Sequence, residues 1–195
     1  MSYPFDVTLA AKLWPAERGT RLARNAALAF GGALALTLSA KAQVPFYPVP
    51  MTLQTLVVLV LGAAFGARLG AAAVALYLAE GLLGLPVFAG AVAGPLYMAG
   101  PTGGFLVGFL AAAALVGFLA ERGWDRSWGR LLAAMTLGHL VVFALGFARL
   151  ALLIGPANAI AAGVTPFVLA TIVKTLLATA TVRAAWGGVQ RLRKA

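Results

Sequence analysis

The stretch VPFYPVPMTLQTL, residues 44–56, places three prolines within six residues and separates two long apolar runs. Proline fixes the backbone and lacks an amide donor, so the helix before this stretch cannot continue through it. Lys41 lies just upstream and is the one positive residue of the expected outer loops. We therefore expect a stiff outer connection between two membrane-spanning helices.

The composition on both sides of this connection is that of a membrane protein. Of the 195 residues, 62% are hydrophobic and 10% are charged, whereas about a quarter of the residues of soluble domains are charged. Apolar runs long enough to cross the hydrocarbon core as helices indicate six spans, at residues 22–40, 51–67, 69–85, 103–121, 130–155 and 158–186. We expect an all-α integral membrane protein with one six-helix domain over residues 22–186. Residues 1–21 are expected to be a cytoplasmic or interfacial segment, and residues 187–195 a basic cytoplasmic tail.

The positive charge follows the orientation of these spans. The net charge is +10, and the lysines and arginines outside the spans lie on one side of the membrane, apart from Lys41. This positive-inside pattern predicts that both termini are cytoplasmic, in a multi-pass protein of the cell membrane. It leaves no basic patch for nucleic acid. The tryptophans on that side are expected to be interfacial anchors: Trp14, Trp124, Trp128 and Trp186.

The sequence offers little for catalysis. There is no cysteine, and His139 is the single histidine, so we expect no metal site and no cofactor. The phosphate-binding pattern GxxxxGK[ST] is absent, so this chain is not expected to hydrolyse ATP by that route. No nucleophile stands with a base, which disfavours a membrane enzyme.

Charged residues inside the spans are few: Glu80, Arg149 and Lys174. Each costs about 2.5–3.5 kcal/mol at the bilayer centre, so such residues usually face a cavity or a partner. The rise of about 1.5 Å per residue places all three in the outer half of the membrane or near its midplane. We interpret them as part of a polar cavity reached from outside.

Helical spacing places further polar groups beside these charges: Gln54, Tyr77 and Thr171. Two cations and one anion suit a small ligand with one carboxylate, which would pair with Lys174 or Arg149. The uncharged part of the ligand would bind Gln54, Tyr77, Glu80 and Thr171. The alternative is that Glu80 forms a structural ion pair with Arg149 or Lys174 and that no ligand binds.

Small residues recur at every fourth position in three spans: Ala27, Gly31 and Ala35, then Gly62, Gly66 and Gly70, then Gly104, Gly108 and Ala112. Such ridges let helix backbones approach closely in lipid. They indicate internal packing, or, on the first span, a membrane partner. A Gly- and Pro-rich outer loop over residues 86–104 joins the opening stretch as a candidate lid.

Several motifs together resemble the BioY family, the biotin-binding S-components of energy-coupling factor (ECF) transporters. They are Q-x-P-x-x-P-V-P-M-T-L-Q-T at residues 43–55, G-x-R-L-G at 66–70, L-Y-L at 76–78, G-L-P-V-F-A-G at 84–90, G-P-T-G-G-F at 100–105, and P-F at 166–167 followed by Lys174. The resemblance covers residues 22–180. Biotin has one carboxylate and a neutral ureido ring, which agrees with the charge of the expected cavity.

This resemblance implies a six-helix S-component bundle that captures biotin from outside. It also implies a transmembrane T-component and two ATPase subunits as partners. Small residues of the first span are similar to the surface by which such proteins dock on the T-component: Ala27, Ala29, Gly31, Ala33 and Ala35. The chain departs from the family pattern at Thr171, where an aspartate is usual, and at Arg149, where an aromatic residue is usual.

Two other interpretations stay open at this stage. One keeps the S-component fold but changes the vitamin to thiamin or riboflavin. The candidate aromatic residues for stacking on such ligands are few: Tyr77, Phe88 and Tyr97. The other is a membrane assembly protein that binds no ligand.

Overall fold

The computed structural model describes residues 8–17 and 19–192. This part of the chain is helical apart from one short pair of strands. In chain order the elements are α1 (Leu9–Leu13), α2 (Arg21–Lys41), β1 (Gln43–Val44), β2 (Met51–Thr52), α3 (Gln54–Phe65), α4 (Ala67–Leu82), α5 (Pro95–Ala99), α6 (Gly103–Glu121), η2 (Trp124–Arg126), α7 (Trp128–Ile154), α8 (Pro156–Gly163), η3 (Thr165–Phe167) and α9 (Val168–Leu192).

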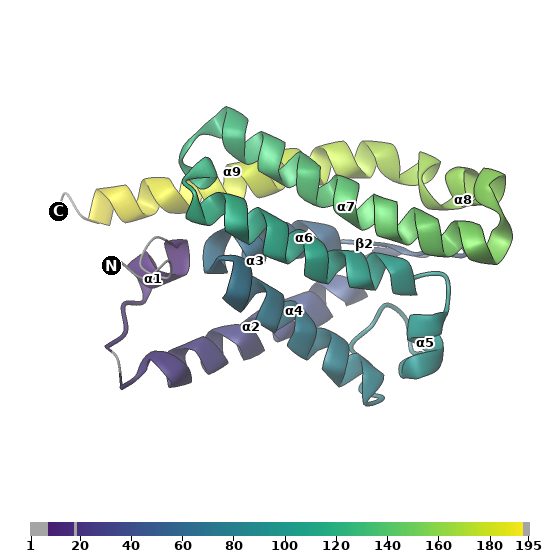
Figure 1. Cartoon of the computed structure of the whole chain (residues 1–195), viewed down its shortest axis with the longest axis horizontal. Coiled ribbons are helices and arrows are strands. Elements are labelled where there is room, and N and C mark those ends of the chain that lie inside the picture. The colour runs from purple at the N-terminus through teal and green to yellow at the C-terminus, as the bar shows by residue number, and fades with distance from the viewer. Residues whose placement is uncertain (1–7, 18, 193–195) are drawn as a thin grey trace.

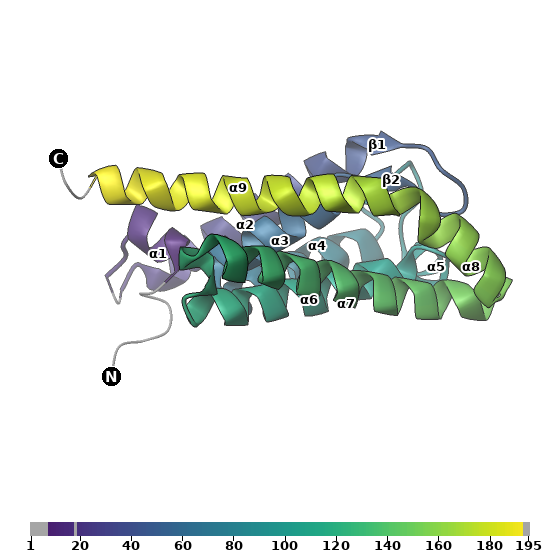
Figure 2. The ribbon, with the colours of Figure 1, turned by 90° about the horizontal axis from the view of Figure 1, so that it is seen from above.

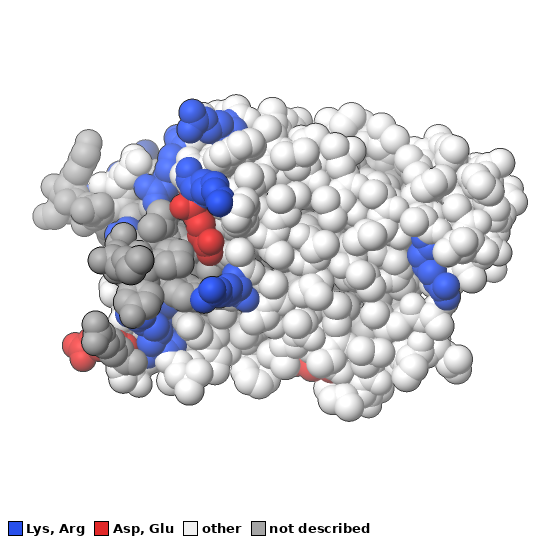
Figure 3. All heavy atoms as spheres, viewed as in Figure 1, with Lys and Arg blue, Asp and Glu red and all other residues white. Residues whose placement is uncertain are grey.

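The helices form an elongated bundle with two chemically different ends. Helices α6 and α7 run side by side, and α9 extends along the length of the molecule (Figures 1 and 2). The strand pair, α5 and α8 gather at one end, whereas α1 and the C-terminal end of α9 lie at the other. On the face drawn in Figure 3, most Lys and Arg side chains gather at the second end. The positive-inside rule predicts that this end is cytoplasmic, and we call the first end the outer end.

Length and composition identify four candidate membrane spans among the described residues. They are α2, α6, α7 and the stretch from α8 to α9. The expected spans at residues 51–67 and 69–85 form α3 and α4, of 12 and 16 residues. At 1.5 Å per residue, α3 is only about 18 Å long, short of the hydrocarbon thickness of about 30 Å.

The extended segment before α3 explains why this helix is short. The two strands lie within residues 43–53, with Gln43 opposite Thr52, and the Leu53 amide donates to the Ala42 carbonyl at 3.1 Å. Non-helical backbone at membrane depth is tolerated where it is buried in protein or lines a cavity. The proline-rich connection therefore takes the place of the outer part of this helix.

The stretch expected as one helix over residues 158–186 is broken in the structure. Helix α8 ends at Gly163, η3 contains Pro166, and α9 begins at Val168. Proline lacks the amide that would continue the helix and clashes with the preceding turn. Gly155, with φ of 82°, makes the corner between α7 and α8, a backbone conformation that favours glycine.

Glycines of the second and fourth expected spans pack inside the bundle, as the spacing indicates. A Cβ on Gly62 would lie 2.7 Å from the Ala113 carbonyl oxygen, and one on Gly108 would lie 2.9 Å from the Val142 Cα. The approach is also close at Gly117, where a Cβ would lie 2.4 Å from the backbone of Ala67. Helix α6 is therefore held against its neighbours by backbone proximity.

We predict that Gly117→Ala destabilises the protein, because the added methyl group meets backbone that cannot rotate away. Overpacking of this kind costs about 1–3 kcal/mol. Gly187→Ala is the matched control, since nothing lies within 4 Å of a Cβ at that helical position. Thermal unfolding of both variants in detergent should show a lower midpoint for Gly117→Ala alone. Equal midpoints would contradict the tight packing.

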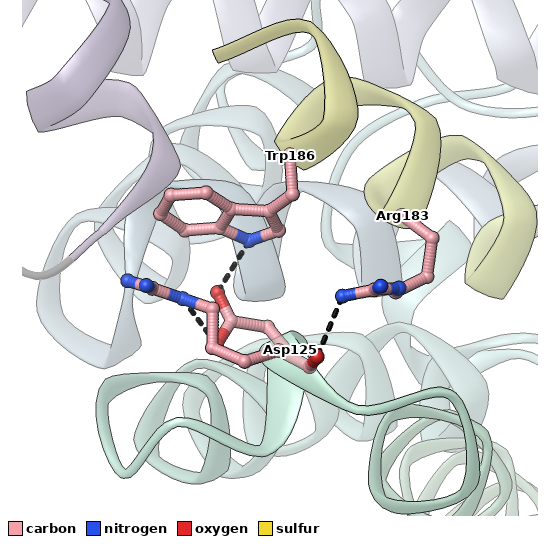
Figure 4. A network of polar contacts seen from close by, with 4 residues as sticks. Asp125, Arg183 and Trp186 are labelled. Atoms are coloured by element: carbon pink, nitrogen blue, oxygen red, sulfur yellow. Dashed lines mark hydrogen bonds and ion pairs between the residues drawn. The ribbon is translucent and has the colours of Figure 1, made fainter. Parts of the chain in front are cut away.

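A polar clamp joins the loop between α6 and α7 to α9 at the predicted cytoplasmic end (Figure 4). The Trp186 indole donates to Asp125 Oδ2 at 2.7 Å, and the Arg126 Nε lies 3.3 Å from Asp125 Oδ1. Arg183 donates to the Arg126 carbonyl at 2.6 Å. Trp186, expected as an interfacial anchor, is instead 3% exposed, because its indole is the partner of the buried carboxyl group.

The environment of Asp125 gives this clamp a pH dependence. Burial raises the pKa of the Asp125 carboxyl, and the Arg126 guanidinium and the Trp186 indole only partly oppose that rise. An aspartate whose pKa is raised by folding stabilises the fold in acid. That contribution is lost as the pH rises through the folded-state pKa. The indole donor therefore matters more as the pH rises and the carboxyl loses its proton.

We expect Trp186→Phe to lower the unfolding midpoint more at a pH where the Asp125 carboxyl is charged than at a more acidic pH where it is protonated. The change leaves a buried oxygen of Asp125 without its donor, which costs about 1–3 kcal/mol. Trp128→Phe is the control, because Trp128 is 57% exposed, and it should change little at either pH. A loss for Trp186→Phe that is the same at both pH values would show that packing alone is affected.

Candidate functional site

A small cavity lies beneath the outer loops, between the strand pair, α3, α6, α7 and α9. Its volume is about 50 Å³. The lining side chains are mostly apolar or hydroxyl-bearing: Val49, Pro50, Thr52, Gln54, Thr55, Ala89, Tyr97, Thr102, Phe105, Leu106, Phe109, Val142, Phe143, Phe167, Thr171 and Lys174. One site is therefore built from α9, from the proline-rich segment and from the loop that precedes α5.

Lys174 is the one charged residue among those that line this cavity. It lies on α9 and is 8% exposed. Its Nζ donates to the Thr52 carbonyl at 2.7 Å, which satisfies a backbone acceptor of β2. An ammonium group has three donors, so this bond leaves Lys174 able to bind a further acceptor in the cavity.

Gln54 is held in place by a chain of hydrogen bonds. Its Nε2 donates to the Tyr77 hydroxyl at 2.7 Å, and that hydroxyl donates to the Val87 carbonyl at 3.2 Å. The Thr52 hydroxyl donates to Gln54 Oε1 at 3.1 Å. Since Gln54 is the first residue of α3 and is 3% exposed, this network orients its amide toward the cavity with little freedom.

Aromatic rings form much of the remaining wall. Phe143 of α7 lies edge to face against both Phe105 of α6 and Phe167 of η3, with centroid distances of 6.2 and 6.4 Å. Phe109 and Tyr97 also line the cavity. Edge-to-face pairs favour one relative orientation of the rings, so this wall is apolar and well defined.

A second, wider hollow lies outside the first. Its volume is about 480 Å³, and it opens between the proline-rich segment and residues 89–102. The two hollows share four lining residues: Pro50, Ala89, Tyr97 and Thr102. Ligand sites usually enclose about 300–1,000 Å³. The inner cavity is far smaller than this, so a drug-sized molecule enters it only if the shared residues move apart.

The structure brings together half of the six residues that the sequence indicates for the site. Gln54, Thr171 and Lys174 line the cavity, and Tyr77 lies behind Gln54 as its hydrogen-bond partner. Glu80 and Arg149 are not among the lining residues.

Arg149 instead donates to the carbonyl of Ala99 at the end of α5. Within residues 8–17 and 19–192, neither Lys174 nor Arg149 forms an ion pair with Glu80. The structural ion pair considered as an alternative is therefore not formed, and the positive charge of the cavity comes from Lys174 alone.

Sequence reasoning missed most of the apolar wall. It named Tyr77, Phe88 and Tyr97 as candidate aromatic residues, but of these only Tyr97 lines the cavity. The phenylalanines that do so lie at ordinary apolar positions of α6, α7 and η3, and nothing in their spacing separates a cavity wall from a packed core. Thr52 and Thr55 could have been found from the sequence, since both are polar and lie within two residues of Gln54.

The site is suited to binding rather than to bond cleavage. It offers one cation, an oriented amide, several hydroxyl groups and aromatic walls. Within the described residues, no group of three His, Cys, Asp or Glu side chains is placed to hold a metal ion. A ligand with one anionic group, an apolar body and a neutral polar group would match these features.

Comparisons with known proteins agree with this picture. The BioY family model matches residues 10–191. The "Biotin transporter BioY" of Thermotoga maritima is 36% identical over 144 residues, which is 73% of this chain and 84% of that protein. The "Biotin transporter BioY2" of Lactococcus lactis subsp. cremoris is 34% identical over 173 residues, which is 83% of this chain and 89% of that protein.

The fold is also similar to that of a solved structure. A crystal structure of "the S-component for biotin from an ECF-type ABC transporter" superposes with a TM-score of 0.72 at 25% identity. The match covers 92% of this chain and 96% of that one. The family match along nearly the whole chain, the relatives and the fold lead to one conclusion: this chain belongs to the BioY family.

Proposed function

We propose that this chain is the biotin-binding S-component of an ECF-type transporter and that biotin binds in the cavity lined by Lys174. The observation that carries the proposal is the single ammonium group in an otherwise uncharged cavity. A buried charge is stable only when it is paired or hydrogen-bonded. A ligand with one carboxylate supplies the missing negative charge.

The rest of the cavity suits the rest of this ligand. Biotin has an apolar ring and side chain, which match the phenylalanine wall, and a neutral ureido group with two donors and one acceptor. The Gln54 amide and the hydroxyls of Thr52, Thr171 and Tyr97 offer both kinds of partner. The threonine at position 171, where the family pattern has an aspartate, leaves Lys174 free of an acidic neighbour and available to the carboxylate.

We predict that Lys174→Met weakens biotin binding by about 10- to 100-fold, since a hydrogen bond to a charged group contributes about 1.5–3 kcal/mol. The measurement is isothermal titration of the purified protein after a wash that removes any ligand carried from cells. Biotinamide, which lacks the negative charge, tests the assignment. The wild type should prefer biotin over biotinamide, and Lys174→Met should lose that preference.

Arg149→Met and Glu80→Gln are the matched controls, because both residues lie outside the lining. Each should bind biotin within a few-fold of the wild type. If Lys174→Met kept full affinity with the fold intact, the carboxylate would have another partner. If the wild type bound thiamin or riboflavin in place of biotin, the proposed ligand would be wrong, but the S-component fold would not be contradicted.

We further propose that α2 docks on the transmembrane T-component, which works with two ATPase subunits to deliver biotin inward. Of the small residues on α2, Ala27 and Gly31 are exposed and Ala35 and Ala29 are half-buried, whereas Ala33 is buried. Large apolar side chains flank this ridge and are also exposed: Phe30, Leu34 and Leu38. A ridge of small residues beside exposed apolar ones suits close helix packing in lipid.

We expect Gly31→Leu to prevent assembly with the T-component while leaving biotin binding unchanged. Nothing lies within 4 Å of a Cβ at Gly31, so the larger side chain does not disturb the chain itself. Ala180→Leu is the control, at an exposed position of α9, and should assemble normally. Co-purification with the tagged T-component and ATPases measures the outcome. If Gly31→Leu assembled normally, the T-component would have to dock on a surface other than this ridge of α2.

In this proposal the chain catalyses no reaction, and ATP is hydrolysed by the partner subunits. It acts in the cell membrane, with the outer end facing the source of biotin. An assembly protein that binds no ligand is the competing function. It predicts no saturable binding of biotin in the titration above.

A further inference from the structure

Lys41 connects the end of α2 to the loop between α4 and α5. Its Nζ donates to the Phe88 carbonyl at 2.7 Å and to the Gly90 carbonyl at 2.9 Å. Lys41 and Gly90 are 49 positions apart in the chain. One ammonium group therefore joins two segments of the outer end that are far apart in the sequence.

The residue between these two carbonyls belongs to the wall of the cavity. Ala89 lines both the inner cavity and the outer hollow. It is one of the residues that must move apart for a ligand to pass between the two. Lys41 thus holds the backbone on both sides of a residue that separates the site from the outside.

The inner side of the same loop is anchored by buried contacts. Phe88 is fully buried, and a Cβ on Gly81 would lie 2.0 Å from its ring. The Phe88 ring stacks on Tyr97 at a centroid distance of 4.9 Å, and the Tyr77 hydroxyl donates to the Val87 carbonyl. These contacts set where the loop rests, because tight packing leaves the ring no second position.

The bonds of Lys41 differ from these contacts because they can exchange with water. Lys41 is exposed, so water can replace either carbonyl when the loop moves, and the net cost of opening stays modest. Gly90, with φ of 78°, and Gly94, with φ of 87°, lie in the same loop at conformations that glycine adopts without strain. The loop thus combines a reversible bond with points of easy bending.

We propose that Lys41 is a positioning residue that latches residues 87–90 over the cavity and thereby sets how fast ligand enters and leaves. This inference rests on the proposed function in taking biotin as the ligand. The latch acts on the partition between the two hollows and makes no contact with the ligand cavity, since Lys41 is not among its lining residues.

The kinetic test uses tritiated biotin chased with unlabelled biotin. Lys41→Met keeps the apolar stem and removes the donors. It should raise the dissociation rate constant about tenfold, which corresponds to about 1.4 kcal/mol. Because the latch is closed in the free chain too, the association rate constant should also rise, and Kd should change less than the dissociation rate. Lys41→Arg keeps donors for both carbonyls and should restore rates near those of the wild type.

A second measurement needs no ligand. The chain has no cysteine, so Val92→Cys, at a position that is 61% exposed, gives a single site for a spin label on the loop. Lys41→Met should increase the mobility of this label in the electron paramagnetic resonance spectrum. A label at Ala180→Cys on α9 should keep its spectrum, which separates release of the loop from general loosening.

The outcomes separate the latch from the proposed function. An unchanged loop spectrum in Lys41→Met overturns the latch, whether or not biotin binds. A mobile loop with unchanged rates, or faster dissociation with slower association, overturns control of ligand exchange by Lys41. Absence of biotin binding in the wild type counts against the proposed function, and the loop spectrum then decides on the latch by itself.

Discussion

A backbone carbonyl in a membrane must find a donor, and at the centre of this structure that donor is Lys174. The chain is not helical over residues 43–53, so the backbone amides and carbonyls that a helix would pair there need other partners. The strand pair satisfies part of this segment, and the Lys174 ammonium satisfies the Thr52 carbonyl. The bond joins α9 to β2 across 122 positions of sequence, so the same interaction closes the bundle and places a cation in the cavity.

The physical requirements of the fold and of the site therefore coincide. The prolines that prevent a helix create the extended wall, and the extended wall needs the lysine. A lysine in an apolar cavity in turn favours a ligand that carries one negative charge. The aromatic rings of α6, α7 and η3 add an apolar surface but no further charge. Selectivity for an anionic ligand would thus depend on a single electrostatic contact. The shape of the cavity and neutral hydrogen bonds would select among such ligands.

The sequence predicts the polar part of this site better than its apolar part. Lys174, Gln54 and Thr171 stand out because polar groups inside apolar runs are costly and few. Arg149 has the same signal but donates to the Ala99 carbonyl at the end of α5, since helical spacing gives a face only to within a fraction of a turn. Pro166 itself indicates a break in the helix, but a span assigned from hydropathy alone runs through it because the flanking residues are apolar. The place of Trp186 near an inner span end predicts an interfacial anchor, whereas its buried partner Asp125 lies 61 positions away and leaves no local pattern.

The arrangement of contacts along α9 suggests how a rigid frame and a mobile cover coexist. Near its outer end α9 is fixed through Lys174, and near its other end through the indole of Trp186. The Trp186 bond is buried and the Lys174 bond is part-buried, and breaking either leaves a buried side chain without its partner, which is costly. The Lys41 side chain is exposed, and so is its bond to the Gly90 carbonyl, which loses much less when water replaces it. Motion should therefore concentrate in the part of the loop beyond Phe88, because α9 is held at two side chains with little exposure, whereas this part of the loop is held by the exposed Lys41.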